Sequence, residues 1–287
     1  MPELNSNWRA EFDDYLESLV SGNGNAVQPL WDALRYSLCD GGKRIRPMLL
    51  LSFFSLFNPN YQSAFPYAAA LEMIHASSLI HDDMPCMDND TLRRGKPTLH
   101  CAMGESMAMI AGDALLNLAY ETMLNSATDM NTIAAMQTIA SSAGVLGVQG
   151  GQYLDTEVSD KTAEIVDETY RLKTARLIEG ACKAGAQLGG ATPEQADLAA
   201  LYGRNLGIAF QIQDDILDVI GDVSVMGKEP GNDEKCQKTT YLSLNGMEKS
   251  ENDVLVLLSE AKSALSVFSK NAESLVRFAD SLIRRKA

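Results

Sequence analysis

The stretch His81-Asp82-Asp83-Met84-Pro85-Cys86-Met87-Asp88-Asn89-Asp90 decides the interpretation of this chain, and Arg93-Arg94-Gly95-Lys96 follows it closely. It places four carboxylates within nine residues, ahead of three cations. Crowded carboxylates repel one another, and a hard divalent cation relieves that repulsion best. Because Pro85 cannot continue a helix, we expect the chain to bulge after Asp83 and to bring Asp88 back toward Asp82.

A second acidic group, Asp214-Asp215-Ile216-Leu217-Asp218, lies far along the chain in an apolar segment. Asp214 and Asp218 are four residues apart and share one helical face, and Gln211 precedes Asp214 by three on that face. Like charges at this spacing require a counter-ion in apolar surroundings. Two such clusters facing each other would hold several Mg²⁺ ions and a polyphosphate between them.

Simpler interpretations of these acidic groups exist. The first stretch could be a solvated turn or a calcium loop, but it lacks the alternating oxygen ligands and final Glu of an EF-hand. The nearby His and Cys residues fit no usual zinc spacing. The second group could be a plain surface face.

Cations with a possible binding role occur in two further places. Gly41-Gly42-Lys43-Arg44-Ile45-Arg46-Pro47 combines two glycines with cations at a predicted helix N-terminus, where anions bind well. The alternative is a helix-start loop with solvated cations. Lys173 lies within a long predicted helix and could be a surface charge. His75 lies on the face of Asp82, two turns earlier, and could equally be a satisfied core residue.

Apolar residues recur with helical spacing along most of the chain. Helices are predicted at 7–20, 30–38, 48–57, 64–81, 104–126, 131–147, 161–189, 193–220, 250–269 and 272–284. The glycines at 144, 147, 150 and 151 are interpreted as sites of close helix packing, and Gln152 and Asp155 as facing a cavity. No strand pattern is evident. We therefore expect an all-α fold of about ten or more helices around a deep cavity, as a single domain over 1–287.

Composition limits the possible partners and location. The chain has 287 residues with 24 Lys and Arg against 38 Asp and Glu, a net charge of −14. Such a charge argues against nucleic acid and anionic membranes as partners. The five cysteines have no Cys-x-x-Cys spacing, which favours a reducing compartment. With neither a signal-peptide pattern nor a long apolar run, we expect a cytoplasmic protein without stable membrane insertion.

These motifs together identify a family. The chain resembles the trans-type (head-to-tail) polyprenyl diphosphate synthases, in particular the bacterial farnesyl and geranylgeranyl diphosphate synthases, over nearly its whole length. The matching blocks are 41–47, Glu72-Met73-Ile74-His75, the first acidic stretch through Gly95, Lys173-Thr174, and Phe210-Gln211 with the second acidic group, Lys228 and Lys238-Thr239-Thr240-Tyr241. One Asp-rich motif would be weak evidence, whereas two on separate helices with the cations in order are specific.

The resemblance implies a prenyltransferase of the geranyltranstransferase or farnesyltranstransferase type. Such an enzyme ionises an allylic diphosphate, joins the cation to isopentenyl diphosphate and loses a proton, which the departing pyrophosphate is thought to take. By resemblance, two Mg²⁺ ions are held by Asp82 and Asp88 and a third by Asp214, supported by Asp83 and Asp218. The allylic diphosphate would be held by Arg93, Lys173, Lys228 and Lys238. Thr174 and Gln211 would face the developing cation. Isopentenyl diphosphate would occupy a metal-free pocket of Lys43, Arg46, His75 and Arg94. The family is usually homodimeric.

Product length depends on the residues just before Asp82. An aromatic residue five positions earlier commonly stops growth at farnesyl in this family, but Ser77 and Ser78 occur here. This open floor favours geranylgeranyl diphosphate slightly over farnesyl diphosphate, although Met48, Met73, Met107 or Met109 could close the floor instead. A class I terpene cyclase and a silent subunit of a heteromeric synthase are the alternatives. The cyclase should lack the isopentenyl pocket, and the silent subunit should have lost one acidic cluster.

Overall fold

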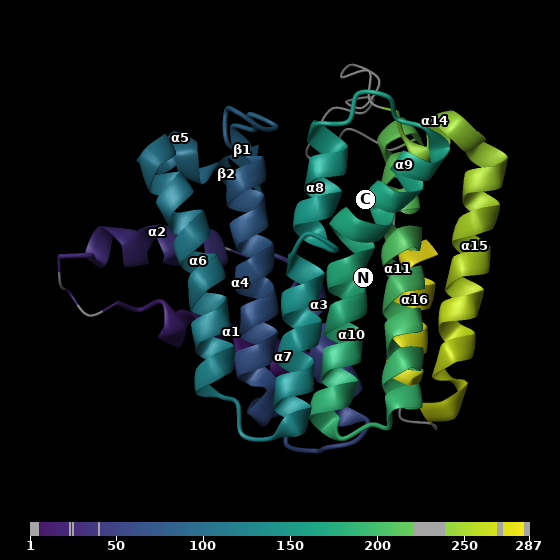
Figure 1. Ribbon diagram of the computed structural model, residues 1–287, viewed down its shortest axis with the longest axis horizontal. Coiled ribbons are helices and arrows are strands. Elements are labelled where there is room, and N and C mark those ends of the chain that lie inside the picture. The colour runs from purple at the N-terminus through teal and green to yellow at the C-terminus, as the bar shows by residue number, and fades with distance from the viewer. Residues whose placement is uncertain are drawn as a thin grey trace.

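The computed structural model describes residues 6–22, 24, 26–39, 41–220, 239–268 and 272–283. Most of the long helices stand side by side and roughly parallel. A short β-hairpin lies at one end of this bundle (Figure 1). The predicted all-α architecture is confirmed. Residues 221–238, among them the predicted ligand-binding Lys228 and Lys238, lie outside the described residues.

The helical elements follow the chain in this order: α1 (Ser6–Leu19), α2 (Gln28–Leu38), α3 (Ile45–Ser55), η1 (Tyr61–Ala64), α4 (Phe65–Asp82), α5 (Leu99–Met103), α6 (Glu105–Asn125), α7 (Met130–Ala143), α8 (Val148–Thr156), α9 (Ala163–Thr169), η2 (Tyr170–Ala175), α10 (Arg176–Gly189), α11 (Pro193–Ile220), α14 (Tyr241–Asn245), α15 (Met247–Ala264), η3 (Leu265–Phe268) and α16 (Glu273–Ile283). The short helices α5 and α14 were not predicted, because five residues carry too little periodicity to be recognised.

One small β-element interrupts the helical architecture. Strands β1 (Leu92–Arg93) and β2 (Lys96–Pro97) form an antiparallel hairpin directly after the first acidic stretch. The expectation of no strand was therefore wrong at this point. Arg94 and Gly95 form its turn with φ angles of 54° and 77°, which suit a tight two-residue hairpin connection. Strands of two residues cannot show an alternating pattern in sequence.

The core is built from the apolar faces of the long helices. One cluster of buried side chains joins α1, α2, α4, α6 and α7, and another joins α11, α15 and α16. Helices α3 and α10 contribute to both, so they connect the two halves. In the described part, no helix is both long and apolar enough to cross a membrane.

Close packing at glycines positions α8 against its neighbours. A Cβ at Gly147 would lie 2.0 Å from the Ser142 carbonyl oxygen, and one at Gly151 would lie 2.1 Å from the backbone nitrogen of Lys173. These contacts confirm the packing interpretation for both residues. The close neighbour of Gly150 is instead the Val145 oxygen at 1.9 Å, in the turn that leads into α8. Gly144 is different, since its nearest neighbour is an ordinary 3.7 Å away.

Candidate active site

The first acidic stretch begins where α4 ends, at Asp82. The chain then turns back, and the backbone N–H of Asp88 donates to the carbonyl oxygen of Asp82 at 2.9 Å. The expected bulge is confirmed, because Pro85 ends the helix and the left-handed Asn89, with φ 53°, completes the turn. Burial raises the pKa of Asp82 to about 6. The charge of Lys173 lowers this pKa, whereas the charge of the neighbouring Asp88 raises it further.

Asp83 faces a different direction from Asp82. Both of its carboxylate oxygens accept hydrogen bonds from the Nε of Arg93 at 2.8 Å, and the side chain is only 5% exposed. Consecutive helical residues point about 100° apart, so this divergence follows from their positions. In this structure Asp83 holds the β1–β2 hairpin, and its supporting role toward a metal stays a prediction.

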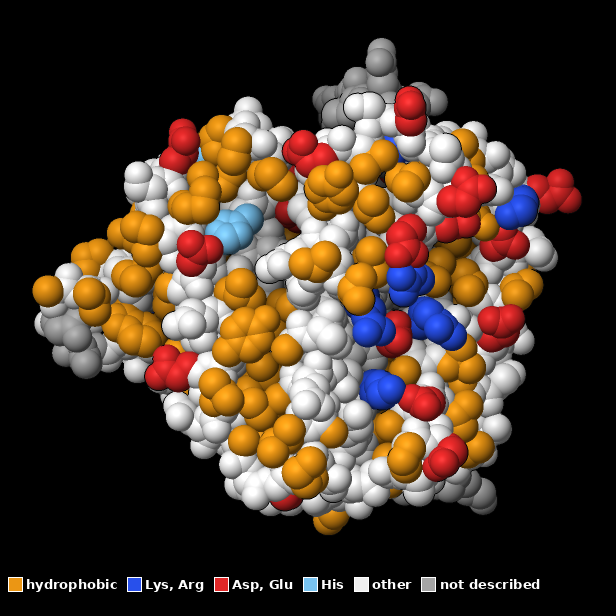
Figure 2. Space-filling view, in the orientation of Figure 1, with side chains coloured by type: hydrophobic (Ala, Val, Ile, Leu, Met, Phe, Trp, Pro, Cys, Tyr) orange, Lys and Arg blue, Asp and Glu red, His pale blue; other side chains and the backbone are white. Residues whose placement is uncertain are grey.

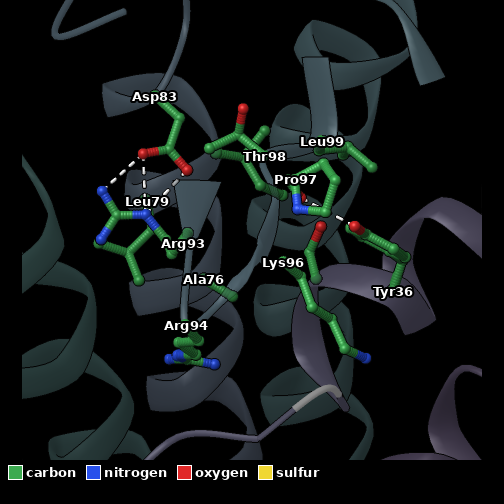
Figure 3. A pocket seen from close by; sticks show the side chains of 12 residues that line it. Tyr36, Ala76, Leu79, Asp83, Arg93, Arg94, Lys96, Pro97, Thr98 and Leu99 are labelled. Carbon is green, nitrogen blue, oxygen red and sulfur yellow. Dashed lines mark hydrogen bonds and ion pairs between the residues drawn. The ribbon is translucent and has the colours of Figure 1, made fainter. Parts of the chain in front are cut away.

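A small pocket of about 50 Å³ lies behind this hairpin, between α2 and α4 (Figure 3). At one side Asp83 meets Arg93, and at the other the Tyr36 hydroxyl donates to the Pro97 carbonyl oxygen at 2.8 Å. The pocket is walled by Ala76, Leu79, Ile80 and Leu99. It therefore lies off the face of α4 that carries Asp82.

The cations of residues 43–46 divide into two kinds. Arg44 caps α3 in the left-handed region, with φ 49°, and its guanidinium donates to Glu72 at 2.7 Å and to Asp13 at 2.9 Å. It is a structural ion pair that sequence reasoning missed. Among the described residues, the buried Nε of Arg46 has no hydrogen-bond partner. Burial lowers the pKa of Arg46, the charge of Arg94 lowers it further, and the charge of Glu72 opposes the shift.

Arg46, Arg94 and His75 form a cationic group, in which the charges act on one another. Burial lowers the pKa of His75 well below its usual value, and Arg46 and Arg94 lower it further. Arg94 donates to the Gly41 carbonyl oxygen at 2.9 Å, and a Cβ on Gly42 would lie 2.9 Å from its guanidinium carbon. Positive charges packed this closely with a neutral imidazole suit a polyanion such as a diphosphate. Lys43 is exposed at the edge of this group.

A polar cavity of about 170 Å³ lies between α8, η2 and α11. Its wall residues are Asp155, Lys161, Val166, Thr169, Tyr170, Lys173, Thr174, Gln211, Asp215, Thr239 and Thr240. Lys173 donates to Asp155 at 2.6 Å, which confirms that Asp155 faces a cavity. Lys161 also donates to the carbonyl oxygens of Leu154 and Asp155 and was not predicted as part of the site.

The segment η2 is π-helical, and such irregular turns are frequent at functional sites. It carries Lys173 and Thr174, which were predicted only as part of a regular helix. Thr174 donates to Gln211 at 2.8 Å, three residues before Asp214 on α11. The charge of Lys173 acts on Asp82 at the end of α4. The segment η2 therefore contacts α11 directly through Thr174, and the charge of Lys173 reaches Asp82 without a direct bond.

The second acidic group ends α11, at the same end of the molecule as the hairpin (Figure 1). Asp214 and Asp218 are half-buried, whereas Asp215 is buried and accepts a hydrogen bond from the Tyr170 hydroxyl at 2.5 Å. Across the described ranges, no three acidic, His or Cys side chains are gathered into one metal-ligating group. Oxygen donors of this kind fit Mg²⁺.

The predicted chain-length residues lie deeper along α4. Ser77 is buried, and the Ser78 hydroxyl donates to the carbonyl oxygen of His75 at 2.9 Å. Among the alternatives for the floor, Met48 and Met73 are buried and Met107 is half-buried. Met109 is 44% exposed, which does not suit an interior floor. Which residue ends the tail's path stays a prediction.

Comparison with known proteins places this geometry in a family. A sequence profile described as polyprenyl synthetase matches residues 27–273. The chain belongs to the polyprenyl synthetase family. It is 40% identical to the geranylgeranyl diphosphate synthase of Cyanophora paradoxa, covering 95% of this chain and 92% of that protein. It is 37% identical to the farnesyl diphosphate synthase of Escherichia coli (strain K12), covering 90% and 89%.

Solved structures agree with this assignment. An FPP/GFPP synthase from Zymomonas mobilis, 34% identical, superposes with a TM-score of 0.85 and covers 96% of this chain and 95% of its own. The geranylgeranyl pyrophosphate synthetase of Pyrococcus horikoshii, 29% identical, gives 0.87 and covers 97% and 96%. The predicted family, all-α fold and prenyltransferase activity are confirmed.

Proposed function

We propose that this protein condenses isopentenyl diphosphate with dimethylallyl, geranyl and farnesyl diphosphates. The observation that supports it most is the position of η2, whose Lys173 acts on Asp82 while Thr174 hydrogen-bonds Gln211 beside Asp214. One segment thus carries a cation to the first acidic group and oriented oxygens to the second. That arrangement suits the ionisation of an allylic diphosphate held between them.

Each part of the site has a distinct task in this reaction. Asp82, Asp88 and Asp214, supported by Asp83 and Asp218, would hold Mg²⁺. When bound, Mg²⁺ supplies positive charge that stabilises the leaving pyrophosphate. Lys173 and Arg93 lie beside the first acidic group and would bind the same diphosphate, with Lys228 and Lys238 from outside the described residues. The Thr174 and Gln211 oxygens would face the allylic cation.

The isopentenyl diphosphate would occupy the separate pocket of Lys43, Arg46, His75 and Arg94. Its diphosphate does not leave, so protein cations suffice there. The depressed pKa of His75 keeps the imidazole neutral near pH 7, and it can donate one N–H to an oxygen without adding to the crowding of charge. The two diphosphates therefore have separate binding sites.

We propose geranylgeranyl diphosphate as the main product, with farnesyl diphosphate as the intermediate. This proposal rests on the small side chains of Ser77 and Ser78, which would leave room for the tail below Asp82. The test incubates the enzyme with isopentenyl diphosphate and each allylic starter in turn, and measures product carbon number by liquid chromatography and mass spectrometry. Farnesyl diphosphate should be extended by one unit. Failure to extend it would reject the open floor.

Substitution of Ser77 tests the same idea from the opposite direction. Ser77→Tyr should stop growth at farnesyl diphosphate, while Ser78→Ala, which keeps the site small, should not change product length. Unchanged length in Ser77→Tyr would show that the tail passes elsewhere. Pyrophosphate released without isopentenyl diphosphate would indicate a terpene cyclase, and no release from either mixture a silent subunit.

The assembly and location are proposed as a cytoplasmic homodimer of a single-domain chain. Exposed apolar side chains occur along consecutive elements, namely Met103, Met109, Ile110, Leu124, Met130 and Ile133. Apolar groups are prominent over α6 and α7 in Figure 2, whereas charged groups gather on the opposite side over α10 and α11. Such a stripe suits a second copy of the chain. Sedimentation velocity should give twice the 31.1 kDa chain mass.

A further inference from the structure

Tyr170 occupies a position that none of the sequence motifs explains. It is the first residue of η2, and its hydroxyl lies between two other elements. It donates to the carboxylate of Asp215 on α11 at 2.5 Å and accepts the backbone N–H of Tyr241, the first residue of α14, at 3.1 Å. One oxygen atom therefore joins three elements around the polar cavity.

The bond to Asp215 restrains the direction of its neighbours. Asp215 is buried, and it points about 100° away from Asp214 around the axis of α11. Holding Asp215 therefore fixes the rotation of the last turns of α11, and with it the direction of Asp214 and Asp218. At 2.5 Å this hydrogen bond is short for an O–H donor, which suits it to this task.

A second contact makes this restraint specific. Thr174, also on η2, hydrogen-bonds Gln211, which lies four residues before Asp215 on α11. Residues four apart occupy adjacent turns of the same helix face. The segment η2 is thus joined to α11 at two points one turn apart. Two contacts one turn apart restrain this end of α11 more firmly than either contact would alone.

We propose that the Tyr170 hydroxyl is a positioning group that sets the second acidic group in its ligand-binding orientation before metal and diphosphate arrive. It also holds the start of α14 to the same point, beside Thr239 and Thr240 of the cavity wall. The proposal rests on the metal role proposed above for Asp214 and Asp218. Tyr170 itself is not expected to contact the reacting atoms.

The test removes only the hydroxyl. Tyr170→Phe keeps the ring, whose centroid lies 6.4 Å from that of Tyr241. The matched control is Tyr241→Phe, because that hydroxyl makes a similar bond to a carboxylate, Asp253 at 2.6 Å, that does not line the cavity. Three quantities are measured: binding of magnesium with inorganic pyrophosphate by calorimetry, steady-state kinetics against Mg²⁺ concentration, and hydrogen exchange of residues 239–245 in metal-free protein.

Tyr170→Phe should weaken magnesium pyrophosphate binding and raise the Mg²⁺ concentration for half-maximal rate by about tenfold each, the effect of losing one charge-assisted bond. The KM for isopentenyl diphosphate should stay unchanged, because its pocket lies elsewhere. The Tyr241 amide should exchange faster, since it loses its acceptor. Tyr241→Phe should retain wild-type binding. Adding Asp215→Asn to Tyr170→Phe should cost less than the sum of the two single changes.

The outcomes separate this inference from the proposed function. Equal magnesium pyrophosphate binding by wild type and Tyr170→Phe would overturn the positioning role alone. An equal loss in Tyr241→Phe would also overturn it, because a general loosening would then explain both variants. Wild-type protein that binds no magnesium pyrophosphate would overturn the metal role and this inference with it. If Tyr170→Phe does not fold, Asp215→Asn and Thr174→Val release the two contact points separately. Their effects on magnesium pyrophosphate binding are then measured alone and together, and full additivity of the two effects would overturn the positioning role.

Discussion

Arg44 and Arg46 are two residues apart, and their substitutions should have opposite consequences. Arg44 forms a buried ion pair with Glu72 at 2.7 Å, with both side chains no more than 4% exposed. Removing one partner of such a pair costs about 3–5 kcal/mol, because the other charge stays buried without compensation. For a chain of this size, Arg44→Gln should lower Tm by roughly 5–8 °C. The half-exposed Asp13 adds little to this figure.

Arg46→Gln should behave differently. Its Nε has no hydrogen-bond partner in the described part of the chain, and its positive charge acts on that of Arg94. Removing the charge should leave Tm unchanged or slightly higher. The same change removes a charged donor from the isopentenyl diphosphate pocket, so the KM for that substrate should rise by about 10- to 100-fold. The KM for the allylic substrate should change little.

Differential scanning calorimetry and steady-state kinetics on both variants measure these quantities. Glu72→Gln is the matched control, since it breaks the same pair from the other side and should also lower Tm. The double variant Arg44→Met with Glu72→Leu should be more stable than either single change predicts. If Arg46→Gln lowers Tm and Arg44→Gln raises the KM instead, the division of the two arginines is wrong.

Three further perturbations address other parts of the site. The pKa of His75 is depressed in the folded protein, so the unfolded chain binds more protons below pH 6.5. The free energy of unfolding should therefore fall as pH drops from 6.5, by up to about 1.4 kcal/mol per pH unit. Urea titrations should show that His75→Gln flattens this slope. Gly151→Ala places a Cβ 2.1 Å from the backbone nitrogen of Lys173, so it should move η2 and lower kcat/KM by about tenfold or more. Gly144→Ala is the control and should be neutral, because the nearest atom lies 3.7 Å away. Equal kcat/KM values in the two variants would refute the role of the Gly151 contact. Chelation of divalent cations by EDTA should stop product formation while isopentenyl diphosphate still binds in calorimetry, because its pocket uses protein cations; loss of both would show a shared metal.

Much of this protein was predictable because its signals are local. Helical periodicity located every long described helix, and Pro85 indicated the turn that returns Asp88 to Asp82. The residues of the acidic groups and the cation motifs identified the family. Errors at this level were small: a hairpin of two-residue strands, two five-residue helices and one glycine that packs against nothing closely.

The partners of the functional side chains depended on the tertiary structure. The chain alone does not tell that Arg44 is buried in an ion pair with Glu72 while the described residues offer the Arg46 Nε no partner, because both arginines follow the same glycines. Lys173 meets Asp155, and Tyr170 meets Asp215, only because α8, η2 and α11 pack together. Sequence spacing determines which residues share a helix face, since that follows from helix geometry. What a face meets is determined by the packing of distant segments, and only the folded chain brings those together.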